Sequence, residues 1–316
     1  MNLSINFFIS LLLCFFLLFF LLFIQYIIII VTDVGQSQHF EMVFKAARAA
    51  NLADERTELR HVPFGLVQGE DGKKFKTRSG DTVRLKDLLD QAVETAESDM
   101  LSRLNLGREK LREKNDINKD LNINPIDLMP LAELSVEDKE VAGIVGIGAV
   151  KYADLSMNRE SNYRFSYSKM LSLTGNTAPY MLYAYARIQG INRKALAGMI
   201  NIDNNQDNSN NSNNSNILSL SSNSLALETK EEQALAKQLM RLDEVLEEVS
   251  RDLYPNKLCE YLFDLSQRFN QFYEKCPVLG AETKELRISR AALCSLTADT
   301  LKLSLGLLGI RTVEKL

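Results

Sequence analysis

The sequence predicts a protein whose first part is α/β and whose second part is all helical. An apolar, strand-like run at residues 27–31 leads into a turn and a helix-like pattern, whereas the apolar patterns after residue 176 recur at helical spacing. The chain has 316 residues, 46% of them hydrophobic, which is enough for two domains of ordinary size. We therefore expect an α/β domain over residues 27–175 and a helical domain over residues 176–316.

The charge balance and the cysteine pattern exclude several classes of protein. The net charge is −4, so any contact with nucleic acid must be local rather than spread over a basic surface. The cysteines form no Cys-x-x-Cys pair and only two histidines are present, so no metal site is predicted. Scattered single cysteines fit structural burial in a reducing compartment, and we expect a cytoplasmic protein. The cysteines are Cys14, Cys259, Cys276 and Cys294.

The first thirty residues differ from the rest of the chain. Residues 7–30 are apolar and carry no charged side chain, and a run of this length can span a bilayer. Three interpretations compete: a signal anchor, a buried strand with an apolar extension, or a gene-model error in which the true upstream exon is missing. We favour the last for residues 1–26, and membrane association is expected only if residues 7–30 are genuine.

The elements of the α/β domain follow in order. Residues 27–31 are expected to form a fully buried parallel strand that delivers Asp33 and Gln36 at its carboxyl end. A helix over residues 39–53 and a second strand over residues 60–68 complete the order of an α/β nucleotide fold. The helix is predicted from the spacing of Phe40, Val43, Phe44 and Ala47.

A cationic loop follows the second strand. Lysine or arginine occupies four of the six positions 73–78, and Gly72 and Gly80 flank them. A mobile, glycine-flanked cationic loop suits a polyanion such as a triphosphate. The alternative is a solvated run of surface charge, which is the commoner role of short basic segments.

The rest of the first domain has three segments of different character. An apolar stripe predicts a helix over residues 82–97. Residues 98–130 are polar and are expected to form an irregular excursion with weak tertiary anchoring. Residues 141–150 are small and apolar, which allows close packing against another helix.

The second domain is predicted to consist of helices interrupted by one insertion. Residues 201–224 are dominated by asparagine and serine and are expected to be a disordered insertion, because they cannot bury enough surface to fold. Helical stripes resume at residue 231, and a final helix over residues 288–308 is expected to end at Gly309. Pro179 is expected in the first turn of the helix that opens the domain.

Several motifs, in this order, resemble the arginyl-tRNA synthetases, a family of class I aminoacyl-tRNA synthetases. The resemblance implies a truncated, doubly wound class I catalytic domain followed by a helical anticodon-binding domain. It covers nearly everything after Ile27 except the insertion and part of residues 100–135. The matching motifs are DVGQSQHF at 33–40, HVPFG at 61–65, GEDGKKFKTRSG at 69–80, KYADLS at 151–156, Asn158-Arg159, residues 176–191 and LGIRTV at 308–313.

The chain departs from the family pattern in two respects. Arg78 stands where the general Lys-Met-Ser-Lys-Ser loop has its last lysine. The His-Ile-Gly-His-type motif, which lies earlier in the family's chain, is absent, as are the tyrosine and aspartate that read the guanidinium of arginine. The resemblance therefore implies half an active site, and we predict that this polypeptide by itself does not activate arginine.

The resemblance also assigns catalytic and substrate-binding roles. Arginine attacks the α-phosphate of ATP, with Mg²⁺ expected to accompany the ATP, and the acyl group then passes to tRNA(Arg). Lys74, Lys76 and Arg78 would oppose the charge on the leaving pyrophosphate. Gln36 would bind the amino-acid substrate, with capping of the next helix as the alternative. His39 would contact the adenosine, with packing as the alternative; His61 is expected to be structural and to bond nearby backbone.

The helical domain is expected to bind tRNA. Unpaired bases are commonly recognised by stacking and hydrogen bonding, although tyrosines in a helical stripe usually belong to a core. A non-catalytic tRNA-binding module and a membrane-anchored, synthetase-derived protein remain alternative functions. Membership of a multi-synthetase assembly is left open. The candidate tRNA-binding residues are Thr177, Tyr180, Tyr183 and Arg187.

Overall fold

The computed structural model describes residues 26–69, 84–117, 129–131, 133–203 and 226–316. Contacts divide them into two compact units. The first comprises the described residues up to Leu66 together with Arg159–Tyr163, and the second comprises the remaining described residues. The predicted boundary between domains at residues 175 and 176 stays a prediction.

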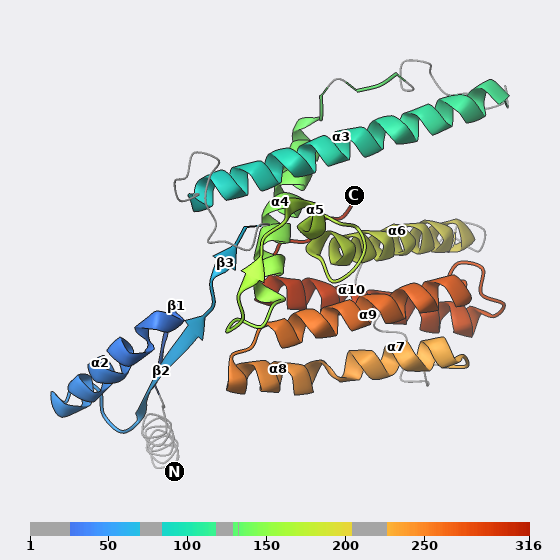
Figure 1. The fold of residues 1–316 in the computed structure, drawn as a ribbon. Coiled ribbons are helices and arrows are strands. Elements are labelled where there is room, and N and C mark those ends of the chain that lie inside the picture. Colours follow the sequence, from blue (N-terminus) through green and yellow to red (C-terminus); the bar gives the residue numbers. More distant parts are fainter. Residues whose placement is uncertain (1–25, 70–83, 118–128, 132, 204–225) are drawn as a thin grey trace, which may run out of the picture. The chain divides into compact units, whose positions relative to one another are not determined.

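The first unit is built around a parallel pair of strands. Strand β1 (Tyr26–Asp33) is followed by the 3-10 turn η1 (Val34–Gln36), helix α2 (Ser37–Ala49) and strand β2 (Thr57–Phe64) (Figure 1). The two strands pair in parallel, from Tyr26 opposite Thr57 to Asp33 opposite Phe64. This confirms the predicted order of strand, turn, helix and strand, although α2 begins and ends earlier than expected.

The expected full burial of the first strand is wrong. The side chains of Ile27, Ile29 and Val31 are 55%, 43% and 60% exposed. A parallel strand is buried only where further elements cover both faces of its sheet. In the described residues this sheet has two strands, so most of β1 remains accessible.

The second predicted strand is divided in two. Strand β2 ends at Phe64, and the short strand β3 (Val67–Gln68) pairs instead with β4 (Tyr163–Arg164). Between them, the Gly65 amide donates to the Arg159 carbonyl at 2.7 Å. A Cβ on Gly65 would lie 2.6 Å from the Ser161 carbonyl oxygen, so the close approach of residues 159–162 requires glycine here.

Helices α3 (Leu85–Ile117) and α4 (Val136–Leu155) open the second unit. The predicted close packing of residues 141–150 is confirmed, because a Cβ added to Gly146 would lie only 2.7 Å from the Ala92 carbonyl oxygen of α3. The predicted irregular excursion is wrong for residues 98–117, which continue α3. This stretch contains no proline and many good helix formers, and it is anchored: Asn105 exchanges two hydrogen bonds with the backbone of Leu131.

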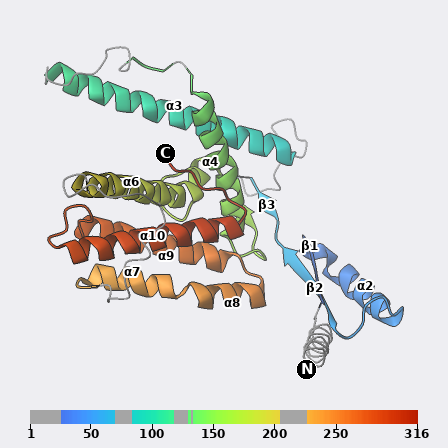
Figure 2. The same ribbon diagram turned by 180° about the vertical axis from the view of Figure 1, so that it is seen from behind.

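The remaining helices form a packed bundle, as predicted. Figure 1 shows α6, α10, α9 and α7 as successive layers with nearly parallel axes, and Figure 2 shows the same order from behind. The core consists of fully buried side chains such as Met181, Ile188, Leu262, Phe269 and Leu301. The helices are α5 (Tyr167–Met170), α6 (Ala178–Asp203), α7 (Lys230–Met240), α8 (Leu242–Asp252), α9 (Asn256–Lys275) and α10 (Lys284–Leu307).

The predicted helix end at Gly309 and the predicted place of Pro179 are confirmed. Gly309 has a φ of +69°, and the next amide, of Ile310, donates to the Leu305 carbonyl at 2.9 Å. This left-handed geometry favours glycine after a helix. Pro179 is the second residue of α6, where its missing N–H leaves no helical hydrogen bond unmade.

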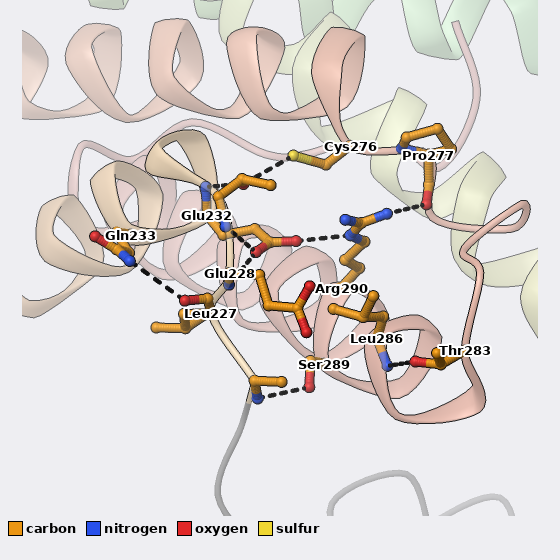
Figure 3. Close-up of polar contacts among 12 residues, drawn as sticks. Leu227, Glu228, Glu232, Gln233, Cys276, Pro277, Thr283, Leu286, Ser289 and Arg290 are labelled. Carbon is orange, nitrogen blue, oxygen red and sulfur yellow. Dashed lines mark hydrogen bonds and ion pairs between the residues drawn. The ribbon is translucent and has the colours of Figure 1, made fainter.

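A buried polar network ties α7 to α10. Figure 3 shows the Glu232 side chain between the amides that precede α7 and the guanidinium of Arg290. Thr229 and Glu232 also form a capping box at the start of α7. The network therefore fixes where the chain enters the bundle after residue 225.

Two predicted segments, the apolar run and the insertion, lie partly outside the described residues. Most of the apolar run 7–30 falls in residues 1–25, outside the described part of the chain. Among the described residues, no helix combines the length and apolar character needed to cross a bilayer. Helix α6 extends to Asp203, and the rest of the predicted insertion lies outside the described residues.

Candidate nucleic-acid interface

The three predicted catalytic cations are not part of the described structure. Lys74, Lys76 and Arg78 fall within residues 70–83, which lie outside it. Their role against the leaving pyrophosphate stays a prediction.

Gln36 lies at the carboxyl end of β1, as expected. It is the last residue of η1, it is exposed, and it makes no side-chain capping bond to α2. The turn is held instead by Asp33, whose Oδ1 accepts from the Gly35 amide at 2.7 Å. Gln36 occupies the N-cap position of α2 without a side-chain capping bond, and its exposed side chain is accessible to a ligand. Its roles as a substrate contact and as a turn residue at the start of α2 both stay predictions.

The two histidines occupy different environments. His39 is exposed on α2, where its ring meets Phe40 edge-on with centroids 5.4 Å apart. His61 stacks on the same Phe40 at 5.2 Å, and its Nε2 lies 2.8 Å from Oγ1 of Thr32 on the neighbouring strand. The structural role predicted for His61 is confirmed, but its partner is a side chain rather than the expected backbone group.

An aromatic and cationic cluster joins α6 to α9. The guanidinium carbon of Arg187 lies 4.8 Å from the ring centroid of Tyr183 and 5.4 Å from that of Tyr273. Both tyrosines are 42% exposed. We call this group, completed by Tyr180 and Asn270, the Tyr–Arg cluster.

Asn270 holds the Tyr–Arg cluster in place. Its Oδ1 accepts from Arg187 at 3.1 Å, and its Nδ2 donates to the Tyr180 hydroxyl at 2.7 Å. The amide thus orients two of the predicted tRNA-binding residues at once. Tyr180 is partly buried and packs on Phe263 with ring centroids 5.7 Å apart, so it also has the core contacts given as the alternative.

Thr177 is engaged at the start of α6. Its hydroxyl donates to the Ser172 carbonyl at 2.6 Å and accepts from the Tyr180 amide at 3.4 Å. These bonds shape the loop that leads into the helix. A direct contact between Thr177 and tRNA stays a prediction.

A cavity of about 380 Å³ lies beside Tyr183. Its walls come from α3, α4, the segment before α6, α6 itself and the segment after α10. Most of the lining is apolar, and its charged side chains are Asp99 and Arg103 of α3. The lining residues are Ala96, Asp99, Met100, Arg103, Leu104, Val145, Leu171, Leu173, Pro179, Tyr183 and Leu316.

Sequence reasoning missed Asn270, Tyr273 and the cavity. The stripe of α9 that includes Leu262, Leu265 and Phe269 is buried, and Tyr273 lies outside it. An aromatic residue outside the buried stripe of α9 could therefore have identified Tyr273 as an exposed aromatic side chain from the sequence. Asp99 and Arg103 had no such signal, because they fall in the stretch predicted to be irregular.

Models of two protein families match this chain. Residues 24–167 match tRNA synthetases class I (R), catalytic domain, and residues 181–316 match the DALR anticodon binding domain. Together they confirm the predicted fold class, in which part of a class I catalytic domain precedes a helical anticodon-binding domain. The second match contains every member of the Tyr–Arg cluster except Tyr180, which lies one residue before it, whereas α3 lies in the first match.

Curated relatives and solved structures agree with these models. The arginine–tRNA ligases of Cyanothece sp. (strain PCC 7425) and Nostoc punctiforme are 51% and 52% identical over 92% of this chain. The chain spans only 43% and 42% of their length. The arginyl-tRNA synthetase of Plasmodium falciparum is 29% identical, with a TM-score of 0.66 over 93% of this chain and 42% of that one. The Thermus thermophilus enzyme shares the fold, with a TM-score of 0.61 at 24% identity over 91% and 41% of the two chains. The chain therefore belongs to the arginyl-tRNA synthetase family.

Proposed function

We propose that the protein acts in the ATP-dependent attachment of arginine to tRNA(Arg), with this chain supplying the tRNA-binding helical domain and part of the catalytic domain. The observation that carries the proposal is the Tyr–Arg cluster, in which Arg187 lies against two half-exposed tyrosine rings. Arg187 and both of these tyrosines lie in the segment that matches an anticodon-binding domain.

The chemistry of the Tyr–Arg cluster suits unpaired bases. Exposed aromatic rings and guanidinium planes stack on bases splayed from single-stranded RNA. The guanidinium also supplies donors to base edges and phosphates. Asn270 restrains Arg187, so less side-chain entropy is lost when RNA binds. A local cluster of this kind is compatible with a chain whose net charge is −4.

The catalytic contribution rests on the cationic loop and Gln36. Lys74, Lys76 and Arg78 would stabilise the negative charge that develops on pyrophosphate, and no side-chain nucleophile is needed. The exposed amide of Gln36 would bind the amino-acid substrate, and His39 would contact the adenosine of ATP. Mg²⁺ would arrive bound to the triphosphate, as it commonly does at nucleotide sites.

This polypeptide by itself is proposed not to activate arginine. Its only histidines are His39 and His61, so a His-Ile-Gly-His-type motif does not occur in the sequence. Function as a tRNA-binding module is the second candidate, favoured by a match to the anticodon-binding domain that continues to residue 316. The cytoplasm is the proposed compartment, because Cys259, Cys276 and Cys294 are free thiols.

Binding of tRNA(Arg) transcript, measured by fluorescence anisotropy, tests the proposal. Arg187→Ala and Tyr273→Ala should each weaken binding about tenfold, as expected for loss of one stacked base contact. Arg251→Ala is the matched control, since Arg251 is an exposed arginine of the same bundle paired with Asp252. Equal affinity of the wild-type chain for tRNA(Arg) and a non-cognate tRNA, or no effect of Arg187→Ala, would contradict the proposal.

ATP–pyrophosphate exchange in the presence of arginine and tRNA separates the two candidates. Specific tRNA binding without exchange is expected of this polypeptide. Exchange by the purified chain would show that it carries a complete catalytic site and would overturn the binding-module alternative.

A further inference from the structure

On the basis of the proposed function, we infer that Asp99 and Arg103 of α3 read the edge of one unpaired tRNA base, which enters the cavity beside Tyr183. The inference assigns base recognition to a helix that belongs to the catalytic-domain match rather than to the anticodon-binding match.

The cavity has the size and lining for a planar, partly apolar group. Its volume of about 380 Å³ lies within the range of small-molecule sites. Ala96 and Leu171, which line it, are each only 5% exposed, and Val145 adds a further apolar side chain. A nucleobase entering from water would bury its apolar faces against these residues.

The charged side chains of the lining supply both kinds of hydrogen-bonding group: Asp99 supplies acceptors and Arg103 supplies donors. A guanidinium nitrogen of Arg103 lies 3.9 Å from Oδ2 of Asp99, with the side chains 50% and 51% exposed. That separation exceeds a hydrogen-bond distance, so the two groups attract each other without a direct bond in this pairing. The Watson–Crick edge of every base combines donors and acceptors, and a carboxylate beside a guanidinium can pair with both.

Tyr183 connects the cavity to the Tyr–Arg cluster. Tyr183 lines the cavity, and its ring centroid lies 4.8 Å from the guanidinium carbon of Arg187. RNA bound at the cluster would therefore lie beside the cavity, and the next unpaired base would be within reach of it. This continuity favours a base of the bound tRNA over an unrelated peptide or lipid as the occupant.

Base discrimination by variants of α3 tests the inference. The affinity of Arg103→Ala, Arg103→Lys and Asp99→Asn is measured by anisotropy for tRNA(Arg) transcripts substituted singly at each anticodon position. We expect Arg103→Ala to weaken binding of the unsubstituted transcript about tenfold and to reduce discrimination at one position by a similar factor. Arg103→Lys should also lose discrimination, because lysine keeps the charge but not the planar fork.

The pair Lys86–Asp90 on the same helix is the matched control. It has the same spacing of four residues with its charges 3.2 Å apart, and neither residue lines the cavity. Lys86→Ala and Asp90→Asn should leave affinity and discrimination within twofold of wild type. Circular dichroism melting curves of all variants report whether any loss reflects unfolding.

The inference and the proposed function fail in distinguishable ways. If the wild-type chain binds no tRNA(Arg), the proposed function is wrong. If Arg187→Ala weakens binding while the Asp99 and Arg103 variants keep wild-type discrimination at every position, the proposed function stands and the inference about α3 is wrong.

Discussion

The Nε of Arg290 donates to Oε1 of Glu232 at 2.7 Å inside the helical bundle (Figure 3). Glu232 is 0% exposed and Arg290 8%. The other carboxylate oxygen accepts from the amides of Glu228 and Thr229, and Arg290 also donates to the Pro277 carbonyl. Both charged groups are buried in this network. Removal of either residue would therefore leave the other as a buried charge without its counterion.

Loss of Arg290 is expected to destabilise the protein strongly. Arg290→Met keeps an unbranched side chain but removes the guanidinium, which leaves the buried Glu232 carboxylate without its counterion. The free energy of unfolding should therefore fall by about 3–5 kcal/mol. Urea denaturation of the full chain measures this. Arg251→Met, at the exposed pair with Asp252, is the control and should cost less than about 1 kcal/mol. A loss at Arg290 no larger than the control would contradict the prediction.

The same network predicts a pH-dependent stability. Burial alone would raise the pKa of Glu232, but the Thr229 amide, Arg290 and the Glu228 amide together hold that pKa below its ordinary value of 4.5. A carboxyl whose pKa is lower in the folded state stabilises the fold above its unfolded pKa and loses that effect as the pH falls through the folded pKa. The stability difference between wild type and Glu232→Gln should therefore shrink below pH 4.5. A difference that stays constant from neutral to acidic pH would refute this.

Two glycines of α4 are expected to respond oppositely to alanine. Gly146→Ala places a Cβ 2.7 Å from the Ala92 carbonyl oxygen, so α3 and α4 must separate and stability should fall by about 1–3 kcal/mol. Gly143 has nothing within 4 Å of the corresponding position. Gly143→Ala should therefore stabilise the helix by about 0.5–1 kcal/mol. Thermal unfolding of the two variants checks the sign of each effect, and destabilisation of both would count against the packing account.

The buried thiols of the bundle are expected to be unreactive in the folded protein. Burial raises the pKa of Cys259 and of Cys294 to about 12, so almost no thiolate is present at pH 8. Peptide mass spectrometry after iodoacetamide treatment should find these two cysteines unmodified in the native chain and modified in urea. Rapid native labelling of either thiol would show that the bundle opens more readily than its packing indicates.

Periodic elements were predictable because their pattern is local. The apolar stripes of α9 and α10 follow directly from residue spacing, and Gly309 marks a helix end by its tolerance of positive φ. The turn after β1 was likewise predictable from the sequence. Helix α3 was underestimated because residues 98–117 carry few apolar residues, and their helical state reflects propensity and anchoring by Asn105 rather than a buried stripe.

The sequence by itself predicted the family, the order of strand, turn, helix and strand at the start of the chain, and the placement of Tyr183 and Arg187 on one helix. The tertiary structure decided which distant side chains meet them. It brings Asn270 and Tyr273 of α9 to Arg187, and it places Asp99 and Arg103 of α3 around the cavity that Tyr183 lines. The physical reason is that periodicity shows which face of one helix is buried, whereas the partners of the exposed face depend on how separate helices pack together.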